Sequence, residues 1–334
     1  MSALFVTRRM SLIGTGLLAS GTARSQPLPA PGSAPARASG FAIGSGTTGG
    51  VYFPLGRTIA GLLNRAQPDL NAVVVATQGS IENVDALGSG KFSLVFTQVD
   101  TAVNAVDGED HYDRKPLKIR ALAHLYSGRM QLVTTAKAGI RRMADLKGKR
   151  VSTGTPGSGN ENMAFRLLKV AAIDRIGDFG KHEFLTPEEG TKRILSGELD
   201  AYFFNSGIPT AAIVELGNAP GVELRLVDHA ELTEGIAARY GHVYFPEIIP
   251  AGTYPRQKAD NKQISVGNIL AVSEGMPAAL VTTVLDTIWT SRAALGETHR
   301  EGTNFALAGQ KTNAIGIPWH PAAEAFWRRQ GAML

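Results

Sequence analysis

At residues 41–50 the chain reads Phe41-Ala42-Ile43-Gly44-Ser45-Gly46-Thr47-Thr48-Gly49-Gly50, a short apolar strand that runs into a glycine-rich loop. A second copy of this plan lies at Val151-Ser152-Thr153-Gly154-Thr155-Pro156-Gly157-Ser158-Gly159. Glycine lets backbone N–H groups approach a ligand closely, and the unpaired N–H groups of a helix start favour negative charge. The two loops therefore predict two similar lobes that hold one anionic ligand between them.

Each loop is followed by alternating helix and strand patterns, which predict parallel sheets flanked by helices. In the first unit we expect strands at 41–43, 72–77 and 92–98 and helices at about 51–64 and 80–87. In the second we expect strands at 151–153 and 199–205, a helix at about 160–172, and a helix that begins after Thr186. Thr186 and Glu189 form a capping-box pattern with Pro187 at the first helical position, and Gly197 suits a left-handed helix end. The predicted fold class is α/β.

Two longer apolar segments, 121–136 and 264–272, are expected to cross from one lobe to the other and form a hinge. Lobe I would then contain residues 40–128 and 261–334, with helices near 277–295 and 321–329. Lobe II would contain residues 129–260.

The N-terminal segment has the pattern of an export signal. Arg8-Arg9 precede an apolar run from Leu12 to Ala19, with small residues at Ala23 and Ser25. We expect residues 1–25 to be an export signal, of the twin-arginine or the ordinary secretory type, and residues 26–39 to be a flexible leader. The mature protein would then be a soluble periplasmic protein.

Composition excludes several classes of function. The chain has 334 residues and a formal net charge of +5, with no run of basic residues interleaved with aromatics, so no nucleic-acid partner is expected. It has no Cys, and its seven histidines show no metal-ligand spacing, so neither a metal nor a cofactor is expected. No Gly-x-Ser-x-Gly elbow is present.

Five motifs in order resemble those of the TAXI family, the extracytoplasmic solute receptors of TRAP transporters. They are Gly49-Gly50-Val51-Tyr52-Phe53-Pro54-Leu55-Gly56, Gly79-Ser80-Ile81-Glu82-Asn83, Ala144-Asp145-Leu146-Lys147-Gly148-Lys149-Arg150-Val151, Gly157-Ser158-Gly159 and Ile249-Pro250-Ala251-Gly252-Thr253-Tyr254. The resemblance covers residues 41–331 and implies a two-lobed fold of the type II periplasmic binding proteins. It also implies a small carboxylate ligand, such as an amino acid or dicarboxylate, and delivery to a sodium-coupled membrane permease, usually with fused subunits.

In lobe I the candidate ligand-binding residues are Thr47, Thr48, Gly49, Gly50, Tyr52, Ser80, Asn83 and Gln98. The first four offer hydroxyl and N–H groups at a helix start. Tyr52 either binds ligand or packs in the core, and Ser80 either caps its helix or contacts ligand, or does both. Gln98 ends a strand, where open parallel sheets place their ligands.

In lobe II the candidates are Gly157, Ser158, Gly159, Asn160 and Asn205. The first three open a helix, and Asn205 ends the strand equivalent to that of Gln98. No arginine is marked as a carboxylate clamp, because Arg57 and Arg166 lie within helices and are expected at the surface. We therefore expect recognition by neutral N–H and hydroxyl groups.

The same residues bear on other functions. Gly44-x-Gly46-x-x-Gly49 fits the dinucleotide fingerprint of an oxidoreductase, but the next strand ends in Thr77-Gln78-Gly79 without the acidic residue that would bind the ribose. Neither loop continues into the Lys-Ser/Thr of a P-loop. A binding protein that serves an ATP-driven importer or a sensor is the closer alternative, and the expected protein is not an enzyme.

Overall fold

The computed structural model describes residues 40–334, so the predicted export signal and leader lie outside the described residues. In the described part, a ten-stranded sheet runs in the order β2-β1-β3-β10-β4-β7-β5-β6, with β8 paired to β4 and β9 paired to β10. The strands are β1 (Ala42–Gly44), β2 (Val73–Val75), β3 (Leu94–Gln98), β4 (Ile119–Thr135), β5 (Arg150–Ser152), β6 (Lys181–Glu183), β7 (Ala201–Ser206), β8 (Leu224–Val227), β9 (Tyr244–Ile249) and β10 (Asn261–Ser273).

The sheet repeats one plan on either side of two long strands. Strand β1 pairs in parallel with β2 and β3, and β5 pairs in parallel with β6 and β7. The order is β2-β1-β3-β10-β4 when read from the β2 edge and β6-β5-β7-β4-β8 when read from the β6 edge. In each case the fourth strand is a crossing strand, β10 next to β3 and β4 next to β7. We call β1–β3 with the helices that cover them the first half, and β5–β8 with theirs the second half.

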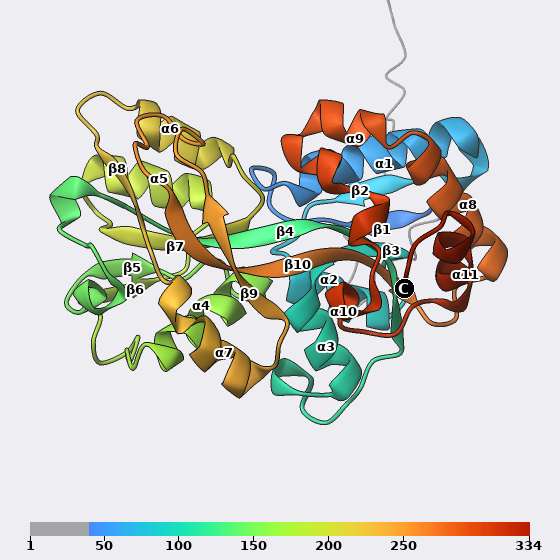
Figure 1. The fold of residues 1–334 in the computed structure, drawn as a ribbon, viewed down its shortest axis with the longest axis horizontal. Helices are drawn as coiled ribbons and strands as arrows, with labels where there is room; N and C mark the ends of the chain where they lie inside the picture. Colours follow the sequence, from blue (N-terminus) through green and yellow to red (C-terminus); the bar gives the residue numbers. More distant parts are fainter. Residues whose placement is uncertain (1–39) are drawn as a thin grey trace, which may run out of the picture. The chain divides into compact units, whose positions relative to one another are not determined.

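Strands β4 and β10 connect the halves, as the sequence predicted for their apolar runs (Figure 1). They pair antiparallel along residues 119–129 of β4, and β4 then pairs with β7 and β8 through residues 129–135. The crossing strands also run antiparallel to β3 and β7, so the sheet is mixed and its outer parts are parallel. The predicted α/β class, with mainly parallel strands flanked by helices in each half, is confirmed. The predicted lobe boundaries stay a prediction.

Helices flank the sheet in both halves (Figure 1). The first half carries α1 (Tyr52–Ala66), α2 (Ser80–Gly88), α3 (Val99–Asp107), α8 (Ala278–Thr290), α9 (Ala293–Thr298), α10 (Thr312–Ile315) and α11 (Pro321–Arg329). The second half carries α4 (Gly159–Val170), α5 (Pro187–Ser196), α6 (Ala211–Asn218) and α7 (Thr233–Tyr240). The single helix predicted near 277–295 is two helices, α8 and α9, separated at Ser291 and Arg292.

Local signals explain several of these boundaries. Thr186 and Glu189 make the predicted reciprocal capping box with Pro187 in the first turn of α5, and Gly197 ends that helix with φ of +78°. Ser80, predicted as a possible N-cap, is instead the first residue of α2, and Gly79 occupies the N-cap position. Glycine suits that place because its φ is +129°, a region that side chains disfavour.

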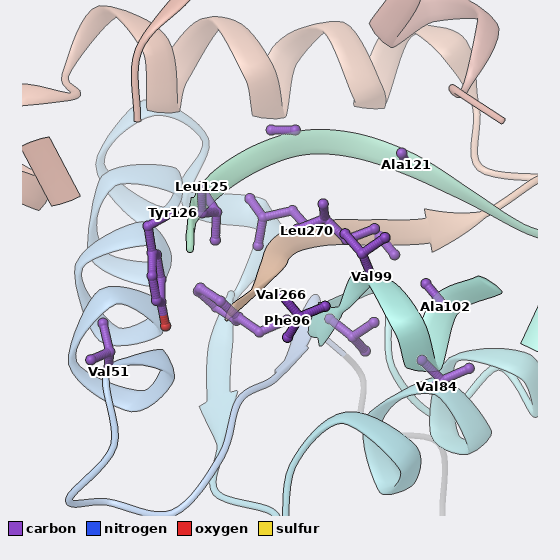
Figure 2. Packing of buried hydrophobic residues seen from close by; sticks show 14 of the residues in the cluster. Val51, Val84, Phe96, Val99, Ala102, Ala121, Leu125, Tyr126, Val266 and Leu270 are labelled. Atoms are coloured by element: carbon purple, nitrogen blue, oxygen red, sulfur yellow. The ribbon is translucent and has the colours of Figure 1, made fainter. Parts of the chain in front are cut away.

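The main hydrophobic core extends across both halves. Figure 2 shows part of it, including Phe96 of β3, Tyr126 of β4, Leu270 of β10 and Val51 at the start of α1. A smaller cluster in the second half contains Tyr202 of β7 and Tyr254. Packing along the crossing strands thus joins the two halves. The carboxyl ends of the parallel strands are available to form a site.

Candidate functional site

The candidate site is a cavity at the carboxyl ends of the parallel strands, where five helices begin. Its lining includes the first residue or the N-cap of each of these helices: Tyr52 of α1, Ser80 of α2, Gln98 before α3, Gly159 of α4 and Pro187 of α5. Three of the helices belong to the first half and two to the second. Because the N-terminal end of each helix is partly positive, the five together produce a field that attracts an anion.

The cavity encloses about 60 Å³ and is lined by neutral groups. Among the described residues 40–334, no Asp, Glu, Lys, Arg or His lines it. The polar lining consists of hydroxyls, amides and glycine backbone, and the apolar lining comes from Val51, Leu185, Pro187 and Phe204 together with the rings of Tyr52 and Tyr126. The positive field therefore comes from backbone dipoles and not from a cationic side chain.

The structure brings nine of the thirteen candidate residues together around this cavity. They are Thr47, Gly50, Tyr52, Ser80, Gln98, Ser158, Gly159, Asn160 and Asn205. Their role in binding a ligand stays a prediction, but the two glycine-rich loops predicted to face each other do so.

Four candidates, Thr48, Gly49, Asn83 and Gly157, do not line the cavity. Asn83 is fully buried, and its amide is used internally: Nδ2 donates to the carbonyls of Ser45 and Phe96, and Oδ1 accepts from Thr77. These bonds hold the loop after β1 against β3, and ligand contact by Asn83 stays a prediction.

The side chains of Ser158 and Asn160 also hold local structure. Ser158 Oγ accepts from Glu161 N at 3.1 Å as the N-cap of α4 and donates to the Thr155 carbonyl at 2.6 Å. Asn160 Nδ2 donates to the carbonyls of Thr153 and Phe203, and its Oδ1 accepts from Asn205 N at 2.6 Å. These bonds place the start of α4 against the ends of β5 and β7.

Two side chains meet across the cavity from the ends of equivalent strands. Gln98 Nε2, at the end of β3, donates to Asn205 Oδ1 of β7 at 3.2 Å. The loops meet as well, because Glu82 N donates to the Gly157 carbonyl at 3.2 Å. The described structure is therefore a closed arrangement of the two halves.

Tyr52 packs in the core and also lines the cavity, and its role in binding a ligand stays a prediction. Its ring packs 5.1 Å from that of Phe96, and its hydroxyl donates to Asn268 Oδ1 of β10. Burial raises the pKa of Tyr52 well above its usual value, which keeps the hydroxyl protonated as a donor. The ring thus forms core and cavity wall at once.

Sequence reasoning missed Tyr126 and Asn268, which line the cavity from the crossing strands. Asn268 carries a recognisable signal, because it is a buried polar residue within the apolar run of β10. Sequence reasoning also missed Thr186, Pro187 and Phe204, which line the cavity. The helix and the strand that contain them were predicted, but no ligand contact was assigned to these residues.

The prediction that Arg166 lies at the surface is wrong, whereas Arg57 is exposed as expected. Arg166 of α4 is buried between the halves, where it hydrogen-bonds Tyr244 Oη at 2.7 Å and Asn104 Oδ1 at 3.1 Å and forms an ion pair with Asp110. A second carboxylate partner, Asp100, 3.8 Å away, lies in the first turn of α3. Helical periodicity alone did not show that this helix face meets another helix.

Within residues 40–334 no group of His, Asp or Glu is arranged to hold a metal ion. The same residues contain no helix with the length and apolar character needed to cross a membrane.

The NMT1-like family model matches residues 43–331, nearly all of the described chain. The chain belongs to the NMT1-like family. Solved structures similar to this NMT1-like chain include the periplasmic aliphatic sulphonate binding protein SsuA from Escherichia coli, at 14% identity over 87% of this chain and 78% of that one, with a TM-score of 0.45. The alkanesulfonate-binding protein SsuA from Xanthomonas axonopodis pv. citri bound to MOPS matches at 17% identity over 88% and 84%, with a TM-score of 0.44. An ancestral arginine-binding protein bound to arginine matches at 13% identity over 80% and 99%, with a TM-score of 0.47.

Proposed function

We propose that this NMT1-like chain is an extracytoplasmic solute receptor that closes over a small carboxylate and delivers it to a membrane permease. The observation that carries the proposal is the convergence of five helix N-termini on a cavity lined by neutral groups. Such a site stabilises an anion through backbone N–H groups and dipoles. A cationic ligand would meet the same field as repulsion, and no acidic side chain of the described lining would offset it.

Closure follows from the position of the cavity between the halves. A ligand that touches Thr47 and Gly50 in the first half and Gly159 in the second gains contacts from both only when the halves meet. Binding therefore shifts the population from open to closed forms by the free energy of those added contacts. A permease that recognises the closed form would distinguish loaded from empty receptors.

Resemblance to the TAXI family supports a sodium-coupled TRAP permease as the partner. Three of the five motifs that carry this resemblance supply cavity residues, among them Tyr52, Ser80 and Gly159. Transport by the reconstituted permease and receptor would test the partner: uptake should require a sodium gradient and proceed without ATP. Uptake that requires ATP would assign the receptor to the alternative importer.

A thermal-shift screen tests the ligand class. The panel contains acetate, lactate, pyruvate, succinate and glutamate, with ethanolamine as the cationic control and NADH as the dinucleotide control. A carboxylate at about 100 times its Kd should add about 2.7 kcal/mol to the free energy of unfolding. Stabilisation by ethanolamine or NADH with no response to any carboxylate would contradict the proposal.

A further inference from the structure

One cavity-lining side chain has a buried polar atom without a partner. Gln98 is 4% exposed, and its Oε1 is buried and accepts no hydrogen bond within residues 40–334. A buried amide oxygen without a donor costs free energy, so it marks a place where a ligand group would complete the site.

The hydrogen-bond network determines which atom of the Gln98 amide, Oε1 or Nε2, has no partner. Asn205 Nδ2 donates to the Gly128 carbonyl at 3.2 Å, so Asn205 turns its oxygen toward Gln98. Gln98 Nε2 donates to that oxygen. Rotating the Gln98 amide by 180° would set two oxygens against each other, so the unpartnered atom is an acceptor.

The neighbours of Gln98 Oε1 supply no donor. Ser80 Oγ accepts from Gln98 N at 3.0 Å, and within residues 40–334 no hydrogen bond joins Ser80 to Gln98 Oε1. Gly159 of the second half lies beside this oxygen, because a Cβ added there would be 2.7 Å from Oε1. The oxygen is therefore covered by a glycine from across the cavity, and a ligand donor reaches it as the halves separate and close again.

We propose that Gln98 selects a short carboxylate with a hydroxyl group beside the carboxylate, a 2-hydroxy acid of the size of glycolate or lactate. This inference rests on the proposed function and narrows its ligand class. The carboxylate lies in the field of the helix N-termini, and the hydroxyl donates to Gln98 Oε1. A ligand with only acceptors beside the carboxylate, such as a 2-oxo acid, leaves that oxygen unpartnered.

Charge and size favour this class over amino acids and dicarboxylates. An ammonium group would enter a positive field, and no acidic side chain in the described lining would neutralise its charge. A cavity of about 60 Å³ holds roughly four to six water-sized groups at about 10–15 Å³ each, which suits glycolate or lactate and is small for glutamate.

Calorimetric titration with four ligands of similar shape tests the inference: L-lactate, propionate, pyruvate and L-alanine. Lactate should bind roughly tenfold more tightly than propionate or pyruvate, because it alone pairs the buried acceptor without adding positive charge. Equal affinity for lactate, propionate and pyruvate would overturn the inference and leave the proposed function standing. Tightest binding by alanine would likewise overturn it. No binding by any carboxylate, in this titration or in the wider screen, would overturn both.

Variants locate the preference at Gln98. Gln98→Met keeps the length of the side chain and removes the acceptor, so the ratio of lactate to propionate affinity should fall to about one while propionate still binds. Gln67→Met makes the same change at an exposed position after α1 and should keep the tenfold ratio. If Gln98→Met still binds lactate tenfold more tightly than propionate, another residue causes the preference for lactate and the role of Gln98 is refuted. If Gln98→Met does not fold, the four affinities of the unmodified chain decide the inference.

Discussion

The carboxylate of Glu188 occupies the space that a side chain on Gly49 would need. An added Cβ on Gly49 would lie 1.4 Å from Glu188 Oε1, a distance that no pair of non-bonded atoms tolerates. Gly49 belongs to the loop before α1, and Glu188 lies in the first turn of α5. The two halves thus approach each other so closely at this point that Glu188 fills the place of a side chain at residue 49.

Gly49→Ala should oppose closure. The Glu188 side chain must move away, and overpacking of this kind costs about 1 kcal/mol or more, so affinity for a bound carboxylate such as lactate should fall at least about fivefold. Titration calorimetry measures the loss. Combining Gly49→Ala with Glu188→Ala should restore most of the affinity, because the obstructing carboxylate is then absent.

Gly61→Ala, in the middle of α1, is the matched control for that substitution. An added Cβ there meets only the end of the Arg65 side chain at 3.5 Å. Affinity should stay unchanged, and stability should rise by up to about 1 kcal/mol because alanine favours the helix. Equal losses of affinity in both variants would contradict the role given to Gly49.

The Thr47 hydroxyl should contribute to ligand binding directly. Thr47 lines the cavity, and its Oγ1 makes no hydrogen bond within the described residues. Thr47→Val keeps the shape of the side chain and removes the hydroxyl, so lactate affinity should fall by about 1 kcal/mol with little change in stability. Calorimetry and urea unfolding of the same preparation separate the two quantities. An unchanged affinity would show that the hydroxyl is merely solvated.

Ser158 should behave differently, because its hydroxyl already caps α4. Ser158→Ala should lower the free energy of unfolding by about 1 kcal/mol through loss of the cap. Ser158→Asp keeps a capping oxygen but adds negative charge to the cavity lining, so it should keep the stability due to the cap, lose the hydrogen bond to the Thr155 carbonyl, and abolish carboxylate binding. If Ser158→Asp binds lactate as the unmodified chain does, the ligand does not lie near the start of α4.

Particular residues show how much of the fold and of the candidate site could be predicted from the sequence. The glycine loops, the capping box at Thr186 and the two apolar crossing strands are local patterns, and each predicted its element and the repeated α/β plan. The repeated plan alone predicted that Gln98 and Asn205, at the ends of equivalent strands, lie on opposite sides of the ligand site.

What the sequence could not supply is pairing between distant residues. Asn83 and Ser158 both lie near helix starts and look alike in the sequence. Only the structure shows that the Asn83 amide is buried and bonded to the Phe96 carbonyl, whereas Ser158 lines the cavity. Arg166 was expected at the surface because it lies within a helix, yet Asp100 and Tyr244 contact it from other elements. Contacts of this kind depend on how elements pack, which a single sequence does not reveal.

His124 should make stability depend on pH. Burial lowers the pKa of His124 to about 4, and its Nδ1 has no hydrogen-bond partner among the described residues. The unfolded chain, with a pKa near 6.5, binds a proton at this residue between about pH 4 and 6.5 that the folded chain does not bind. Stability therefore falls as pH is lowered through that range, and the part due to His124 reaches about 2 kcal/mol at pH 5.

His124→Gln should remove that part of the pH dependence. Urea unfolding at pH 7.5 and pH 5 measures it, and the loss of stability between the two pH values should be about 2 kcal/mol smaller in the variant. His242→Gln, at an exposed position, serves as the control. Identical losses in His124→Gln and the unmodified chain would show that the folded protein accepts the proton at His124.

Arg166 should contribute strongly to stability because it neutralises a buried carboxylate. Asp100 is 1% exposed, and burial raises its pKa against the opposing effect of Arg166 and the hydrogen bond from Tyr244. Arg166→Met leaves this carboxylate without its cation, which should cost about 3–5 kcal/mol at neutral pH. Arg166→Met combined with Asp100→Asn should recover much of that loss, since no buried charge then remains unpaired at residue 100.

The pH dependence of this loss gives a second measurement. Without Arg166 the folded-state pKa of Asp100 lies still further above its unfolded value, so the folded form holds the proton more tightly and the penalty grows as pH rises. The destabilisation of Arg166→Met should thus be smaller at pH 5 than at pH 7.5. Arg57→Met, on the exposed face of α1, should change stability by no more than about 0.5 kcal/mol. A comparably small effect of Arg166→Met at both pH values would mean that Asp100 is already protonated and that the pair carries no charge.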